Sequence, residues 1–560
     1  MLEADTLADH LAVNHPEFLF HKLYFDAYKK EQSGGQGDFP DVRTNLQKLF
    51  KDGLLLLNYT GHGNTTSLSD EQIVAIADIT QASYTRLPVW VTSTCDFTRF
   101  DDIATSAGEE VFLNAKSGGI ALFTTVRVAW RPYNAYIDSH LLHNLFAKKE
   151  GKRQTLGDAI KAMKRAMVDN YSSSANLVKL CFCLIGEPGL KLAYPEYKVQ
   201  VTSVNGKPVN EDPITFKALE KITVEGQIIN TLGKVASDFK GIVNPTIKDS
   251  KVMVSCLDNN NTGVEPFTYT DYPNTLFIGN DSVRNGKFTF TFTVPKDISY
   301  SGLQGKMNLY AVDTERGIEA HGNFDNFTVG GTSASTEKDT IGPEIRVLYL
   351  NDTTFVDGAQ VNTTPYFIAK LWDKSGVNIT GSSIGHDMML IIDDSPLLGY
   401  NLNSYYELLP GEEGAGMVRF SIPKLSAGVH TAEVWGWDIQ NNSTVHQFTF
   451  EVVEGLKPYI FDVIATPSPA REQVTFHISH NRPESRMTVG IMVYDLSGRR
   501  LWKHEESGKS DLFDGYSVSW NLTVNGARVR PGVYIYRAAI RTDNSKEATK
   551  AHKFIVLGKE

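Results

Sequence analysis

A histidine and a cysteine each follow an apolar segment within the first hundred residues. His62 comes shortly after the run Leu54–Tyr59 and lies between two glycines, and Cys95 comes shortly after the run Val89–Thr92. A thiol has a pKa of about 8.5 and reacts as the thiolate, so a histidine within reach can activate it and later protonate a leaving amine. The pair predicts nucleophilic catalysis, with Cys95 as nucleophile and His62 as general base and acid.

Backbone groups beside these two residues fit the same chemistry. Gly63 lets the chain approach a substrate closely, and the amides of Gly63 and Cys95 are placed to donate to a developing oxyanion. On spacing alone the alternative is a packed core cysteine beside a surface histidine, because free cysteines are usually buried.

Alternating strands and helices are expected to position the pair in residues 1–197. The predicted strands are Leu54–Tyr59, Val89–Thr92, Gly119–Thr125 and Leu180–Ile185, and the predicted helices are about Asp41–Lys51, a helix through Ile79 begun by the capping box Ser69–Gln72, Tyr136–Lys149 and Thr155–Asn170. This order predicts an α/β domain, a parallel sheet with helices on both faces. His62 and Cys95 are 33 residues apart, which suits one βαβ unit, and would share the carboxyl edge of the sheet.

The rest of the chain has the period-two pattern of β-sandwiches. We expect three β-sandwich domains, an Ig-like one at 198–335 and others at 340–454 and 456–560. An aspartate repeatedly ends a strand and enters a polar turn, at Asp313, Asp373, Asp438 and Asp495. Such aspartates are expected to bond their own turn rather than a ligand.

Composition narrows the function classes. The 560 residues carry a net charge of −10, which argues against nucleic-acid binding, although residues 456–560 alone are basic. Four cysteines are too few for a disulfide framework, and Cys181 and Cys183 are expected to pack in the core from one face of a strand. No apolar run approaches the about 18 residues that span a bilayer.

Several segments of residues 1–195 resemble the gingipain family of caspase-like cysteine peptidases. The segments are NYTGHG, VWVTSTCDF, GGIALFTT and NLVKLCFCLIGEPGLKL. The resemblance implies a caspase-like domain in which His62 is the catalytic histidine and Cys95 the nucleophile. Trp130 falls near a tryptophan that lines the substrate pocket of arginine-specific members, with plain packing as the alternative. The family's acidic residue that orients the histidine lies upstream of the stretch that residues 1–12 resemble. The chain is therefore expected to begin inside the catalytic domain.

The tail carries a second resemblance. TPSPAREQVTF, MVYDLSGRRLW and PGVYIYR resemble the C-terminal sorting domain of type IX secretion cargo, and STCDFTRFDD resembles the sortase branch of the gingipain family. This implies an exported sortase at the outer-membrane cell surface of Bacteroidetes, which cleaves cargo sorting domains. Implied partners are that cargo, other type IX outer-membrane components and anionic lipopolysaccharide. The alternatives are a secreted endopeptidase that only hydrolyses, and a catalytically silent surface binding protein.

No cofactor is expected, and a structural calcium ion is left open. Asp101 and Asp102 follow the nucleophile, and the segment Asp258–Asn261 is rich in oxygen ligands. That segment lacks the glycine position and terminal glutamate of an EF-hand loop, so a solvated turn is the expectation.

Overall fold

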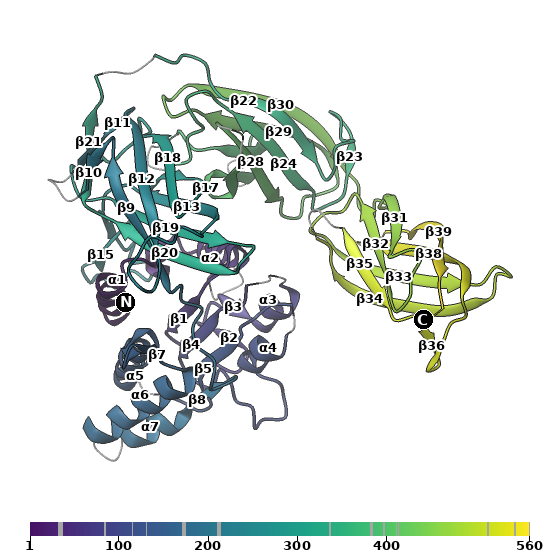
Figure 1. Ribbon diagram of the computed structural model, residues 1–560, viewed down its shortest axis with the longest axis horizontal. Coiled ribbons are helices and arrows are strands. Elements are labelled where there is room, and N and C mark those ends of the chain that lie inside the picture. The colour runs from purple at the N-terminus through teal and green to yellow at the C-terminus, as the bar shows by residue number, and fades with distance from the viewer. Residues whose placement is uncertain are drawn as a thin grey trace.

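We describe the protein from a computed structural model. The structure describes residues 1–558 except 32–36, 83, 85, 115, 130, 171–174, 210–213, 335–337, 381–384, 396–397, 410–411, 413, 512–514 and 543–544. An α/β domain is followed by three β-sheet units that succeed one another in an arc, with the C-terminal unit at its far end (Figure 1).

The α/β domain is built on a sheet with strand order β1-β4-β5-β8. Its helices are α1 Leu2–Asn14, α2 Pro40–Asp52, α3 Ile76–Gln81, α4 Ala107–Leu113, α5 Arg131–Phe146, α6 Leu156–Asn170 and α7 Ala175–Cys181. Its strands are β1 Leu56–Thr60, β2 Ser67–Leu68, β3 Val74–Ala75, β4 Val89–Ser93, β5 Ala121–Thr125, β6 Lys148–Lys149, β7 Lys152–Arg153 and β8 Phe182–Ile185.

Helices cover both faces of this sheet, as the sequence predicted. Alternate residues of β4 point to opposite faces, because side chains alternate along a strand. Val89 and Val91 join a core with α5 and α6, and Trp90 joins a second core with α2. On α2 the buried residues recur every four positions, which is the pattern of a helix with one apolar stripe. The predicted caspase-like α/β class is confirmed.

The end of the domain differs from the prediction in strand direction. β1, β4 and β5 are parallel, but β8 runs antiparallel to β5. Leu180 and Cys181 belong to α7 rather than to the last strand, so Cys181 and Cys183 do not share one strand face as expected. An apolar run predicts a buried strand but not its direction.

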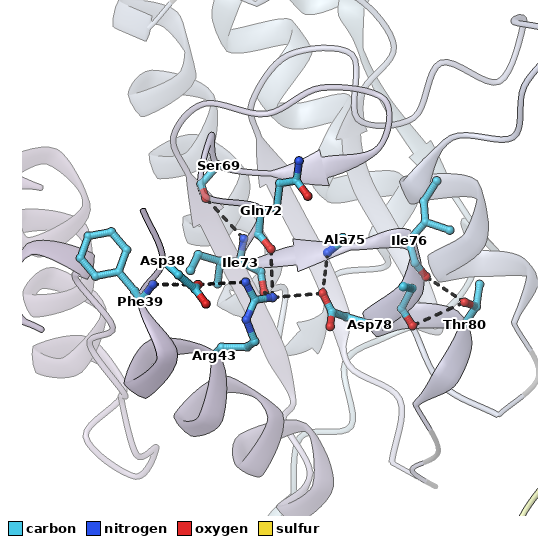
Figure 2. A network of polar contacts seen from close by, with 11 residues as sticks. Asp38, Phe39, Arg43, Ser69, Gln72, Ile73, Ala75, Ile76, Asp78 and Thr80 are labelled. Atoms are coloured by element: carbon cyan, nitrogen blue, oxygen red, sulfur yellow. Dashed lines mark hydrogen bonds and ion pairs between the residues drawn. The ribbon is translucent and has the colours of Figure 1, made fainter. Parts of the chain in front are cut away.

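The helix predicted to start at Ser69 is also wrong. A short hairpin of β2 and β3 occupies this segment, and the helix begins only at Ile76. Ser69 and Gln72 both have positive φ, 63° and 53°, which no helix start allows. Arg43 of α2 holds the hairpin by donating to the carbonyls of Gln72 and Ile73 at 3.0 and 3.1 Å (Figure 2). Tertiary contacts therefore outweigh the local capping motif.

Figure 2 also shows how α3 is tied to the same arginine. Asp78 accepts a hydrogen bond from the Ala75 amide at 2.8 Å, which caps the helix, and it accepts another from Arg43 at 3.2 Å. Arg43 further pairs with Asp38 at the start of α2. One guanidinium thus joins α2, the hairpin and α3.

Three β-sheet units follow the α/β domain. The first has β9 Tyr197–Val204, β10 Lys207–Pro208, β11 Ile214–Ala218, β12 Lys221–Ile229, β13 Gly241–Lys248, β14 Val252–Ser255, β15 Thr268–Asp271, β16 Thr275–Ile278, β17 Asp281–Val283, β18 Lys287–Thr293, β19 Lys306–Asp313, β20 Ile318–Phe324 and β21 Phe327–Thr332. The second has β22 Glu344–Leu350, β23 Gln360–Val361, β24 Tyr366–Trp372, β25 Met389–Ile392, β26 Gly399–Asn401, β27 Tyr406–Leu408, β28 Ala415–Ser421, β29 Gly428–Trp437 and β30 Ser443–Val452. The third has β31 Ile460–Thr466, β32 Val474–His480, β33 Arg486–Tyr494, β34 Arg500–Lys509, β35 Tyr516–Trp520, β36 Thr523–Val524, β37 Ala527–Arg528, β38 Gly532–Arg541 and β39 Ala548–Val556.

Each β-unit has its own core. In the first, a sheet that includes β9, β12, β13, β18, β19 and β20 shares its core with the pair β11–β21, whose Phe216 and Phe327 stack at 4.3 Å. The second and third units each pair two sheets around one core, as sandwiches do. The exact domain boundaries stay sequence predictions, although each of these sheets lies within one predicted unit apart from Tyr197.

The aspartates that end strands do cap turns, as predicted. Asp373 accepts from the amides of Ser375 and Gly376, and Asp438 accepts from those of Gln440 and Asn442. Asp313 and Asp495 likewise accept from backbone amides two to four residues on. The recurring aspartate is a feature of the turns.

The first β-unit packs against the start of the α/β domain. Lys22 bonds Asp5 and Asp9, each at 2.7 Å, and also donates to the Thr270 carbonyl at 3.0 Å. Asn259 bonds Asp26 across the same contact. Within the described residues, no helix combines the length and apolar character needed to cross a bilayer.

Candidate active site

His62 and Cys95 follow paired positions of two neighbouring parallel strands. Thr60, the last residue of β1, is the register partner of Ser93, the last residue of β4. His62 and Cys95 each come two residues later, so both stand at the same carboxyl edge of the sheet. The structure thus brings the two predicted residues onto adjacent loops, in matched positions.

Two hydrogen bonds hold the histidine loop by its backbone. The His62 carbonyl accepts from the Tyr59 hydroxyl at 2.6 Å and from the Ser69 amide at 2.8 Å. Ser69 lies in the hairpin that Arg43 anchors, so α2 supports this loop indirectly. The His62 side chain itself is exposed. The main chain is fixed while the imidazole can face a substrate.

The loop that carries Cys95 turns sharply and is hydrogen-bonded to β5. Asp96, directly after Cys95, has φ 51°, a left-handed conformation that is uncommon outside glycine and that recurs at functional sites. The Thr94 carbonyl accepts from the Thr125 hydroxyl at 2.7 Å, which ties the loop to β5. Cys95 is partly exposed, and in this structure its thiol donates to the Ala129 carbonyl at 3.5 Å rather than to His62.

The two loops touch at Gly63 and Thr94. A β-carbon at position 63 would lie 2.5 Å from Thr94 Oγ1, so only glycine fits without displacement. Neither the Gly63 amide nor the Cys95 amide donates a hydrogen bond to any atom of the described residues. These two amides are therefore available to donate to an oxygen atom of a substrate.

A buried carboxyl group lies beneath the His62 and Cys95 loops, and the sequence analysis did not predict it. Asp138 of α5 is 1% exposed and accepts hydrogen bonds from Thr60 Oγ1 at 2.8 Å and from Ser93 Oγ. Burial raises the pKa of Asp138 to about 7, against the opposing effect of hydrogen bonds from Ser93, Thr60 and Asn58. The available signal was a polar pair, Asn134 and Asp138, spaced four apart beside the apolar stripe of a helix.

The loop after Cys95 is bound to the loop after β5 by an ion pair. Arg127 donates to both carboxylate oxygens of Asp101, at 2.9 and 2.5 Å. These hydrogen bonds hold the pKa of Asp101 below its ordinary value. Phe100, Ile103 and Val128 expose apolar side chains on the same two loops. The loop after Cys95 and the loop after β5 therefore expose apolar side chains and are joined by a bidentate ion pair.

The α/β domain matches the model of a known protein family. Residues 1–193 match the model of peptidase family C25. The α/β domain belongs to peptidase family C25. Members of this family are cysteine peptidases.

Solved structures similar to the chain include gingipain-type proteins. Dimeric latent PorU from Porphyromonas gingivalis is 34% identical over 79% of this chain and 41% of that chain, with a TM-score of 0.33. The Arg-specific cysteine proteinase gingipain R is 17% identical over 51% of this chain and 56% of that chain, with a TM-score of 0.26. The chain thus spans about two fifths of the PorU chain. No curated protein matches it.

The other residues singled out from the sequence of the C25 domain are Trp130, Cys181 and Cys183. Trp130 falls outside the described residues. Cys181 is partly buried at the end of α7, and burial raises the pKa of its thiol. Cys183 is partly buried on β8, where burial raises its thiol pKa to about 11. Neither thiol is activated as a nucleophile should be.

Within the part of the chain that the structure describes, the two oxygen-rich segments do not belong to a group of side chains close enough to hold a metal ion. Asp101 is engaged by Arg127, and Asp258 accepts from Thr262 and Gly263 in a turn, as expected. Elsewhere, carboxylate oxygens of Asp339, Asp373 and Asp438 lie within 4.8 Å of one another in the second β-unit. A structural calcium ion stays a sequence-based prediction.

Proposed function

We propose that this protein is a cell-surface sortase of the type IX secretion system. It would remove C-terminal sorting domains from secreted cargo and pass the cargo to an amine on anionic lipopolysaccharide, or to water. The observation that carries the proposal is the matched placement of His62 and Cys95 on touching loops of a C25 domain. The resemblance of residues 456–560 to a sorting domain supports the secretion system and the outer-membrane location.

The geometry supports a two-step acyl transfer. His62 takes the Cys95 proton as the sulfur attacks the scissile carbonyl, and the oxyanion receives hydrogen bonds from the amides of Gly63 and Cys95. The C–N bond then breaks, His62 gives the proton to the leaving amine of the sorting domain, and the cargo remains as a thioester on Cys95. An acceptor amine or a water molecule attacks the thioester and frees the thiol.

One experiment separates this function from its alternatives. A cargo protein with its sorting domain is incubated with the chain, with and without anionic lipopolysaccharide, and the products are weighed by mass spectrometry. An amide-linked cargo adduct supports transfer to lipopolysaccharide, whereas a free carboxylate in both arms shows that the cargo passes only to water, as in an endopeptidase that only hydrolyses. Cleavage should vanish in Cys95→Ala and persist in Cys181→Ala, a matched loss of a partly buried thiol. Unaltered cleavage in Cys95→Ala would end the proposal.

A second experiment tests the proposed place of action. Deleting residues 456–560 should leave Cys95 reactivity in vitro unchanged, because that unit has its own core. In cells the same deletion should remove the protein from the outer-membrane surface and from contact with other type IX components. Normal surface display of the deleted chain would contradict the assignment of this unit as a sorting domain.

A further inference from the structure

The carboxyl group of Asp138 lies directly beneath the edge of the sheet that carries His62 and Cys95. It projects from α5 and accepts hydrogen bonds from one hydroxyl on each of two strands, Thr60 of β1 and Ser93 of β4. Because Thr60 and Ser93 are register partners, a single side chain clasps both strand ends at the same level. The two candidate catalytic residues each stand two positions beyond this clasp.

The helix holds β4 by a second polar contact. Asn134, one turn before Asp138, donates from Nδ2 to the Ser93 carbonyl at 3.2 Å. Ser93 is thus fixed through both its hydroxyl and its carbonyl, and both contacts come from α5. Since Ser93 is itself fully buried, its position leaves little freedom to the loop that follows.

A buried carboxyl joins two strands only at a penalty in folding free energy, because a charge without a counterion is poorly solvated in the protein interior. The groups that face Asp138 are Asn58 and Thr60 from β1 and Ser93 from β4, and within the described residues no charged side chain contributes to its raised pKa. Apolar packing would hold two strands at lower cost. A destabilising carboxyl group directly beneath the His62 and Cys95 loops points to a role in that site.

We propose that Asp138 is a positioning residue for the His62–Cys95 pair. By accepting from Thr60 and Ser93 it sets the spacing of the two strand ends, and so the approach of imidazole to thiol. The proposal rests on the proposed function only in taking these two residues as the catalytic pair. It assigns Asp138 no contact with substrate.

The test measures the reactivity of the Cys95 thiol in addition to the turnover of cargo. The full chain is treated with iodoacetamide from pH 5 to 9, and alkylation of the Cys95 peptide is followed by mass spectrometry. A thiolate stabilised by an imidazolium reacts well below pH 7, whereas an unpaired thiol follows one ionisation near about pH 8.5. In Asp138→Asn we expect the low-pH reactivity to fall about tenfold or more. With cargo as substrate, kcat should fall while KM changes little.

Two kinds of variant serve as controls. Ser117→Ala removes a buried hydroxyl whose hydrogen bond to Ile79 lies elsewhere in the domain, and it should keep the wild-type profile. Thr60→Val and Ser93→Ala each remove one donor to Asp138, and each should shift the profile as Asp138→Asn does. Their effects should be less than additive with Asp138→Asn, because all three break the same clasp. If Asp138→Asn does not fold, these two variants carry the test.

The outcomes are distinguishable. A lowered melting temperature with an unchanged alkylation profile and kcat in Asp138→Asn would overturn the proposal and leave Asp138 a structural residue. Loss of low-pH reactivity together with normal cargo processing in Cys95→Ala would support the positioning role while ending the sortase function. A wild-type Cys95 that reacts only as an unpaired thiol would overturn both.

Discussion

Gly63 and Thr94 are in direct contact, and they join the histidine loop to the cysteine loop. A β-carbon on residue 63 would meet Thr94 Oγ1 at 2.5 Å and the Ser67 carbonyl at 3.2 Å. Thr94 therefore limits which residue can follow His62. This contact, together with the strand register, determines how closely the two loops approach.

Gly63→Ala should force the two loops apart. We expect the rate of cargo cleavage to fall at least about tenfold, and the free energy of unfolding to fall by about 1–3 kcal/mol because of overpacking. Thr94→Ala removes the two atoms nearest to the new β-carbon, so the double variant should recover most of the lost rate. Failure of this rescue, measured as kcat/KM on a cargo substrate, would show that the glycine acts through something other than this contact.

His62→Ala and Cys95→Ala should be equally damaging, because the two side chains act as one unit in a nucleophile–base pair. Each should lower cargo cleavage at least about a thousandfold, with little change in melting temperature since His62 is exposed and Cys95 is small. The double variant should be no worse than either single one. Near-normal cleavage by His62→Ala would mean that another base serves Cys95.

The raised pKa of Asp138 predicts that the free energy of unfolding falls as the pH rises towards 7. Its pKa of about 7 in the folded chain exceeds the ordinary carboxyl value of about 3.9, so the folded state binds the proton more tightly. Its contribution is complete below about pH 4 and is lost as pH rises towards and through 7, on the order of 4 kcal/mol in total. Urea titrations of wild type and Asp138→Asn from pH 4 to 8 should show this slope only in wild type. Parallel curves for the two proteins would rule out the assigned titration.

Asp101→Asn should loosen the loop that follows the nucleophile, because it weakens the bidentate pair with Arg127. We expect faster cleavage of residues 96–106 by an added protease and a higher KM for cargo, with kcat less affected. Asp102→Asn is the matched control, since Asp102 pairs at 3.6 Å with Arg99 within the same loop. Equal effects of the two substitutions would argue against a specific role for the Arg127 contact.

Local patterns predicted most strands and helices of the α/β domain but not how they meet. The helix expected from Ser69 is a hairpin because Arg43, a residue 26 positions earlier, binds the carbonyls of its turn. The sequence predicted the last strand, β8, but not that it runs antiparallel to β5, because an apolar run does not indicate the direction of a strand. Asp138 was missed for a similar reason: its partners Thr60 and Ser93 are 78 and 45 residues away.

The sequence by itself predicted the chemistry, and it determined that His62 and Cys95 stand at matching positions of the sheet. A histidine and a cysteine placed after successive buried strands must reach the same edge if those strands are parallel neighbours, because parallel strands share a direction. Alternation of polar and apolar residues also determined the three β-units. The tertiary structure alone decided which groups surround the pair. The Gly63–Thr94 contact, the placement of the Gly63 and Cys95 amides and the carboxyl beneath the strand ends depend on the packing of distant segments, and no local pattern encodes such distances.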